Sequence, residues 1–184
     1  MASDPANSLV MEAVDIYIAP LGSAEPATIT AEFPAAWLQV GIIDGDSGIE
    51  EAREWGKDND FYGIGPAGSI LVTSVKGQFK LTRKFEFLED NENTRQILWP
   101  GSTETLLVTP QPVPTLLGMT VWYQNGTKER LITKNRALIN VEGYSLNEEL
   151  TKFPATATVY PTSDGELFTR QVQAPVTTTT TTGA

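Results

Sequence analysis

The sequence predicts a mainly β fold, a β-sandwich or partly rolled barrel with one short α-helix. Apolar and polar residues alternate in several segments, most cleanly in residues 77–90, where Phe79, Leu81, Phe85 and Phe87 share one face. Segments rich in Gly, Pro, Asn and Asp separate these runs, as turns do between strands. The 184 residues are enough for one domain with a real core, and the chain contains no internal repeat or domain boundary.

The N-terminal part begins with an extended arm, expected over residues 1–13. Residues 1–10 contain no Lys or Arg and no long apolar run, so they do not resemble a secretory signal, and we expect the chain to fold in a cytoplasm. The first strand is expected over 13–20, where apolar residues alternate up to Pro20. A largely buried strand is expected over 35–44.

A long inter-strand loop is expected at about residues 44–68, where acidic residues outnumber basic ones and Gly recurs. Loops of more than about 12–15 residues are uncommon in compact domains and are usually functional. Strands are expected to follow over 68–77 and 77–90. The second of these places Arg83 among the apolar residues of its face.

The one helix is expected at about residues 91–99. Asp90 or Asn91 can accept hydrogen bonds from the free N–H groups at its start, and Pro100 with Gly101 ends it. Its expected buried contacts are Ile97, Leu98 and Trp99.

The second half of the chain predicts more strands. A proline-rich connector over 108–118 is incompatible with a central strand. Residues 119–133 predict a hairpin, with Asn125–Gly126 in a two-residue type I′ turn. Strands over 136–145 and 150–161 are expected to complete the sheet.

Two features mark the end of the domain. Pro154 lacks an N–H group, which predicts that its strand lies at a sheet edge or carries a bulge. The β domain is expected over 14–170, followed by a Thr-rich tail over 171–184 that is extended or disordered by itself.

Composition argues against several functions. The chain has no Cys and no His, which removes thiolate chemistry, the commonest general base and the commonest transition-metal ligand. The net charge of −10 opposes nucleic-acid binding, because phosphates are neutralised by basic residues. No stretch approaches the length of a membrane span. We therefore expect a protein that is not an enzyme, takes no cofactor and has no membrane association.

The acidic residues do not form a convincing site. Asp44 and Asp46 begin like a calcium loop, but the later ligand positions of an EF-hand are not filled, so a turn rich in Asp and Gly is expected. Glu50 and Glu51 could be weighed as glycosidase acids, yet adjacent strand residues point to opposite faces. The pair Asp58/Asp60 lies among polar residues and is expected to be solvated.

Aromatic residues within the polar segment favour an interface. Trp55, Phe61 and Tyr62, with Trp122 and Tyr123 of the hairpin, could form a sugar-binding platform. Aromatic anchors within a polar frame are also typical of protein interfaces. We favour contact with another copy of the chain, with the following expected inter-subunit contacts: Trp55, Phe61, Tyr62, Glu51, Arg53 and Asp58.

Three segments, in this order, resemble the major tail tube proteins of long non-contractile-tailed phages, especially those infecting actinobacteria. They are "VDIYIAPLGSAEPAT", "WLQVGIIDGDSGIEE" and "FKLTRKFEFLEDNENTRQILWPG". The resemblance covers residues 14 to about 170. The threonine run departs from a plain tube protein, and in some relatives such a tail leads to an immunoglobulin-like domain.

The resemblance implies a structural virion protein, assembled in the host cytoplasm. Six copies would form a ring by joining sheets edge to edge, and rings would stack into a tube through the long loop and the N-terminal arm. The implied partners are further copies of the chain, a tape measure protein, a tail terminator and a distal tail protein. Genomic DNA would pass through the lumen without specific binding, so we expect the lumen to be net negative.

Two other functions stay open. One is a tail terminator or baseplate hub ring protein, which would form single rings. The other, from a different class, is a carbohydrate-binding β-sandwich.

Overall fold

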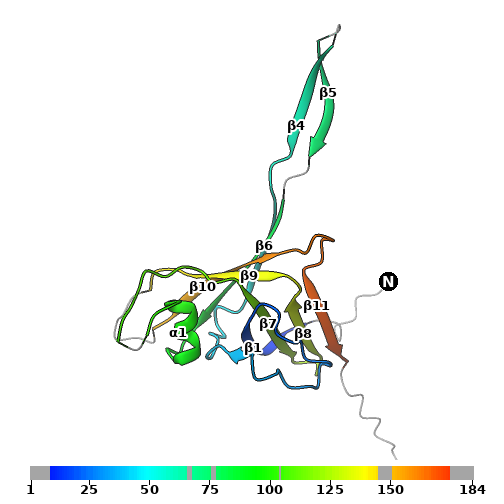
Figure 1. The fold of residues 1–184 in the computed structure, drawn as a ribbon. Helices are drawn as coiled ribbons and strands as arrows, with labels where there is room; N and C mark the ends of the chain where they lie inside the picture. Colours follow the sequence, from blue (N-terminus) through cyan, green and yellow to red (C-terminus); the bar gives the residue numbers. More distant parts are fainter. Residues whose placement is uncertain (1–8, 66–67, 76–77, 104, 145–150, 175–184) are drawn as a thin grey trace, which may run out of the picture.

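The computed structural model describes residues 9–65, 68–75, 78–103, 105–144 and 151–174. It confirms the predicted mainly β fold with one short helix (Figure 1). The strands are β1 Met11–Pro20, β2 Leu38–Gln39, β3 Glu50–Trp55, β4 Asn59–Gly65, β5 Gly68–Val75, β6 Phe79–Phe87, β7 Thr115–Tyr123, β8 Lys128–Thr133, β9 Arg136–Val141, β10 Phe153–Tyr160 and β11 Phe168–Gln173, and the helix α1 is Glu92–Leu98.

Nine strands form one antiparallel sheet that is not closed, in the order β11-β8-β7-β9-β10-β6-β3, with β1 paired to β7 and β2. We divide it into a β7 layer (β2, β1, β7, β8 and β11) and a β6 layer (β9, β10, β6 and β3). The layers are joined where Thr115 of β7 pairs with Ala137 of β9. The two remaining strands, β4 and β5, form a separate two-stranded sheet.

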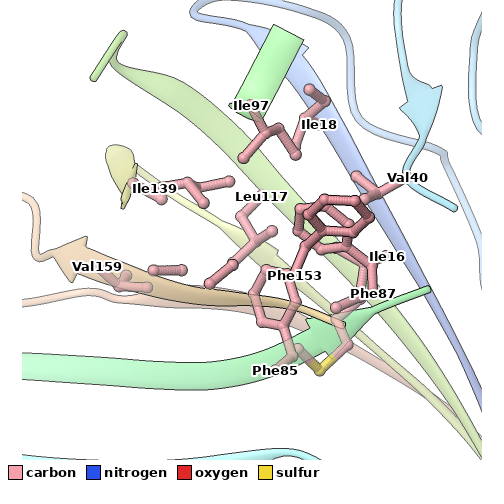
Figure 2. Close-up of a cluster of buried hydrophobic side chains, with 14 of the residues drawn as sticks. Ile16, Ile18, Val40, Phe85, Phe87, Ile97, Leu117, Ile139, Phe153 and Val159 are labelled. Carbon is pink, nitrogen blue, oxygen red and sulfur yellow. The ribbon is translucent and has the colours of Figure 1, made fainter. Parts of the chain in front are cut away.

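The main core lies between the two layers and α1 (Figure 2). The predicted alternation of β6 is confirmed, because Leu81, Arg83, Phe85 and Phe87 are buried and the residues between them are not. The Phe87 ring stacks on Phe153 of β10 with centroids 5.6 Å apart. Burial of such side chains, at about 1.5–3 kcal/mol each, is the main stabilising term of the fold.

The helix matches its prediction. The Asn91 side chain accepts from the backbone N–H groups of Asn93 and Thr94, and the Thr94 hydroxyl accepts from the Asn91 N–H in return. This reciprocal pair satisfies backbone groups that a helix start leaves free. Ile97 and Leu98 are buried, and Trp99 is half-buried against the core.

A second apolar cluster covers the outer face of the β7 layer. The segment between β1 and β2 folds back so that Phe33 and Trp37 pack over Gly118 of β7. The buried Arg130 guanidinium lies 4.5 Å from the Phe33 ring and donates to the carbonyl groups of Thr28 and Ala31. β7 is therefore buried on both faces, although its first four residues lie in the connector predicted to contain no central strand.

The predicted strand over 35–44 is wrong except at β2. Val40 N–H donates to Ile16 of β1, whereas Asp44 N–H donates to Glu86 of β6. The chain crosses from one layer to the other within these few residues, so it cannot pair with either layer for long.

The hairpin between β7 and β8 is confirmed, but the predicted two-residue type I′ turn is wrong. A type I′ turn needs positive φ at both central residues, and here only Gly126 has it, at 82°. Gly126 N–H donates to the Tyr123 carbonyl, and Tyr123 N–H donates to the Thr127 carbonyl. The turn is therefore a three-residue loop, in which the Asn125 side chain accepts from Thr127 N–H.

The predictions for Pro154 and for the chain end also need correction. Pro154 belongs to β10, which pairs with both β6 and β9 in continuous register, so it lies neither in an edge strand nor at a bulge. Pro154 comes directly before Ala155, the first β10 residue that pairs with β9. The missing N–H of Pro154 therefore falls at the end of the β9–β10 pairing, where few hydrogen bonds are lost. Residues 171–173 belong to β11, which the sequence did not predict, and residues 175–184 lie outside the described part.

The long loop predicted at about 44–68 is largely strand. β3 extends the edge of the sheet beside β6, and β4 pairs with β5 in a hairpin that projects from the body of the molecule (Figure 1). The prediction failed because β3 carries charged residues on both faces and β4 contains two Gly among polar and apolar residues, so neither strand has the alternation that marks a half-buried strand.

Replacing Gly118 by Ala is expected to destabilise the fold by about 1–3 kcal/mol. A Cβ at this position would lie 2.8 Å from Phe33 Cε1 and 2.9 Å from Trp37 Cζ3, closer than such atoms approach. The matched control is Gly143→Ala, where a Cβ meets no atom within 4 Å. Urea unfolding of both variants measures the difference, and equal midpoints would contradict the tight packing of the outer cluster.

Candidate functional site

The most distinctive surface of the molecule is the hairpin of β4 and β5, which we call the arm (residues 59–75). Neither strand pairs with the larger sheet, and Figure 1 shows the arm extending away from it. Seven residues of β4 span about 23 Å at the rise of an extended strand. A two-stranded hairpin by itself is marginally stable in water, so an arm of this kind gains most from packing against a partner.

Three large aromatic side chains are exposed on the arm and at its base. Trp55 is 70% exposed, Phe61 54% and Tyr62 60%. Trp55 ends β3 and makes an edge contact with Phe79, with ring centroids 4.9 Å apart, so one side of its ring still faces solvent. Phe61 and Tyr62 are adjacent in β4, where the pairing with β5 shifts register. Solvent-exposed aromatic side chains of this kind are typical anchors of protein interfaces.

The two strands that carry the arm, β3 and β6, are joined by a buried cation. Arg83 of β6 donates from both Nε and Nη2 to Glu51 Oε2 of β3, at 3.1 and 2.8 Å. The same guanidinium lies 4.5 Å from the Phe168 ring of β11 and donates to Met119 Sδ. Arg83 thus connects strands from both ends of the sheet order, which keeps the open sheet rolled.

The charge of Glu51 is stabilised by this arrangement. Partial burial raises the pKa of Glu51, but hydrogen bonds and charge interactions with Arg83 and Arg53 outweigh it and lower the pKa overall. A carboxylate is therefore maintained beside the buried guanidinium at neutral pH.

The six predicted contact residues do not form one patch. Glu51 faces inward to Arg83, whereas Arg53 is 70% exposed and forms an ion pair with Glu51 at 2.6 Å. Asp58 lies in the short connection between β3 and β4. Trp55, Phe61 and Tyr62 therefore provide the exposed aromatic surface. Glu51 has a structural role, because it joins β3 to β6 through Arg83.

Glu50 and Asp44, which were considered for a catalytic or metal site, form ion pairs with lysines instead. Glu50 pairs with Lys84 at 3.7 Å on the exposed face, so it diverges from Glu51 as strand geometry requires. Asp44 accepts hydrogen bonds from Lys152 and Ser47, which lower its pKa to about 2. Among the described residues, no group of three or more acidic side chains is placed to hold a metal ion.

An apolar groove of about 610 Å³ lies beside α1. It is lined by residues such as Leu21, Leu38, Ile97 and Val113, and none of its lining residues is titratable. The groove therefore offers apolar contact surface and provides no acid or base for catalysis.

The sheet edges formed by β3 and β11 complete the candidate surface. In the described part of the chain, β3 pairs only with β6, and β11 pairs only with β8. Each edge has backbone N–H and C=O groups that another strand could join. Sequence reasoning missed β11, although the Asp164–Gly165 turn before it was an available signal. It also missed the exposed apolar residues Leu106 and Leu107.

No protein-family model matches the chain, and no curated protein sequence is significantly similar to it. In the described residues, no helix has both the length and the apolar character needed to cross a membrane.

Replacing Glu51 by Ala is expected to lower the free energy of unfolding by about 3 kcal/mol, because it leaves the buried Arg83 charge without its carboxylate. The matched control is Glu50→Ala, which removes a solvent-exposed pair and should change stability by less than about 1 kcal/mol. Denaturant unfolding checks both values. Similar effects of the two substitutions would contradict the structural role of Arg83.

Proposed function

We propose that the chain is a structural subunit that assembles with copies of itself, as the major tail tube protein of a long non-contractile-tailed phage. Six copies form a ring, rings stack into a tube, and the tube conducts the genome. The observation that carries the proposal is the projecting arm, which has exposed aromatic side chains and, in the described residues, pairs with no strand of the larger sheet.

The position of the arm favours stacking. It leaves the sheet at the start of β6, whereas α1 and its apolar groove follow the end of β6, about 30 Å further along a nine-residue strand. When a protrusion on one subunit binds a different surface of the next copy, the contact is head-to-tail. Such contacts form an open filament unless the rotation between copies closes them into a ring. This supports growth along one axis through the arm.

The open edges favour ring closure. β3 and β11 are different surfaces, so pairing β3 of one copy with β11 of the next is also head-to-tail and closes into a ring when the rotation is right. Pairing β3 with β11 covers the backbone groups that these two edge strands leave free.

The charge of the chain suits a conduit. A net charge of −10 weakens adhesion of DNA phosphates to the wall, over a screening length of about 8–10 Å at physiological salt. In this proposal the lumen is net negative, the protein catalyses no reaction, and the further partners are a tape measure protein, a tail terminator and a distal tail protein of the same virion.

Negative-stain electron microscopy of the concentrated protein tests the proposal. Tubes of stacked rings are expected. Single rings would favour a tail terminator or hub protein, and monodisperse monomers that bind glycans would favour a carbohydrate-binding module built on the exposed aromatics.

Removing the arm is expected to abolish tubes while leaving a folded subunit. Gly56 N–H donates to the Gln78 carbonyl at 2.9 Å, so these residues are neighbours and an Asn-Gly turn can replace residues 57–77. Thermal unfolding and electron microscopy of this variant give the two readouts. Tubes of normal length from the armless chain would exclude the arm from stacking.

Replacing Trp55 or Phe61 by Ser is expected to raise the concentration needed for assembly at least about tenfold, since each loses roughly 1.5–3 kcal/mol of apolar burial in the contact. Monomer stability should change little because both side chains are more than half exposed. Sedimentation measures assembly and urea unfolding measures stability. Thr73→Ala, an exposed change on the same arm, is the control, and an equal effect of the control would argue against aromatic anchoring.

A further inference from the structure

The apolar groove beside α1 is a surface without charge that faces solvent. Its volume of about 610 Å³ lies within the range of about 300–1,000 Å³ that is typical of ligand pockets. Leu21 and Val113 form part of its wall and are still 51% and 55% exposed. Among the described residues that line the groove, Gln96 and Thr115 are the only polar ones, and none is charged. The groove therefore has apolar surface that the described chain leaves uncovered.

The arm has two faces that differ in charge. Alternate residues of a strand point to opposite faces, and directly paired residues of neighbouring strands share a face. Asn59 and Phe61 of β4 therefore lie on the same face as Thr73 of β5, which pairs with Phe61. Asp60 and Tyr62 lie on the other face, where the Tyr62 hydroxyl is 3.5 Å from the Asp60 carboxylate. Phe61, which is 54% exposed, thus belongs to the face of the arm that has no charged residue.

The groove fits the Phe61 face of the arm better than the Asp60 face. A carboxylate that enters the groove loses its water and meets no basic partner among the lining residues, which is costly. The Phe61 face brings no charge, and the Phe61 ring gains free energy by leaving water. Aromatic side chains that fill a pocket of the partner are typical of the residues that dominate protein interfaces.

The Phe61 side chain that enters the groove must come from another molecule. The arm projects away from the body of the subunit, whereas α1 lies against that body (Figure 1). β6 begins beside the base of the arm and runs for about 30 Å before the chain reaches α1. A contact between the arm of one copy and the groove of the next is therefore head-to-tail.

We propose that the groove beside α1 binds Phe61 from the arm of another copy of the chain. Leu21 and Val113 at the rim pack against the Phe61 ring, and the face with Asp60 points away from the groove. The inference rests on the proposed function, because it takes the arm as the stacking element, and it names the surface to which the arm binds.

Disulfide trapping between two variants tests this contact, because the chain has no native Cys. Thr73→Cys keeps Phe61 and places a thiol beside it on the same face of the arm. This variant is mixed with Leu21→Cys or with Val113→Cys, at the concentrations used for electron microscopy, and the mixture is oxidised mildly. A disulfide forms only when the two Cα atoms approach within about 7 Å. At least one rim position is expected to give a disulfide between chains, identified by peptide mass mapping.

The matched control replaces the rim cysteine by Ile42→Cys, because Ile42 is 62% exposed and does not line the groove. The rim disulfide is expected to form at least about tenfold faster than the control disulfide, since docking raises the local thiol concentration. Equal rates, or no disulfide at either rim position, would overturn the inference. If the wild-type chain forms tubes under the same conditions, that result leaves the tube proposal standing. A fast rim disulfide without tubes would instead support the contact and reject the tube.

A charge placed in the groove gives a second readout. Val113→Asp is expected to raise the concentration needed for assembly at least about tenfold, because the new carboxylate would lie against the Phe61 ring without a partner. Ile42→Asp is the matched control and should change that concentration less than about twofold. Urea unfolding checks that both variants fold, as their exposed positions predict.

Equal assembly of the Val113→Asp and Ile42→Asp variants would overturn the inference. Normal assembly of Val113→Asp, together with a small apolar molecule found by native mass spectrometry on the purified wild-type chain and lost from this variant, would assign the groove to a ligand and also overturn it.

Discussion

The buried guanidinium of Arg83 is the interaction on which the rest of the structure depends. It projects from β6 into the space between the layers, where it binds Glu51 of β3 and packs on the Phe168 ring of β11. A buried charge without a partner is strongly destabilising, so both strands must stay close to it. One side chain therefore keeps an open nine-stranded sheet rolled and also fixes the edge strand from which the arm projects.

The structure combines a packed body with a surface that contacts other copies in the proposed assembly. The core aromatics and the capped helix belong to the body, and their contacts lie within the chain. The arm and the edges of β3 and β11 have apolar side chains or backbone groups that face solvent. A fold with both features gains stability by joining other copies, and this is the physical basis of the proposed tube.

The sequence predicted those parts of the fold in which the local pattern of apolar and polar residues matches the burial of those residues in the structure. The alternation of β6 and the Asn91 cap are local features, and both were recognised. β3 was not, because charged residues occupy both of its faces and remove the period-two pattern. β11 was not predicted either, because it is short and mostly polar and lies within the segment expected to be a Thr-rich tail. The exposed Trp55 and Phe61 could be identified from their polar surroundings, but the partnership of Glu51 with Arg83 depends on the register between β3 and β6, which composition does not encode.

Amide hydrogen exchange of the arm at two protein concentrations tests the central claim most directly. If the arm is stabilised by a neighbouring copy, the β4 amides of Asn59–Ile64 will exchange rapidly in dilute monomer, because a lone hairpin opens readily. The same amides will become protected at concentrations where assemblies form, while β6 amides stay protected in both. Assemblies in which the β4 amides exchange as fast as in the monomer would contradict the account.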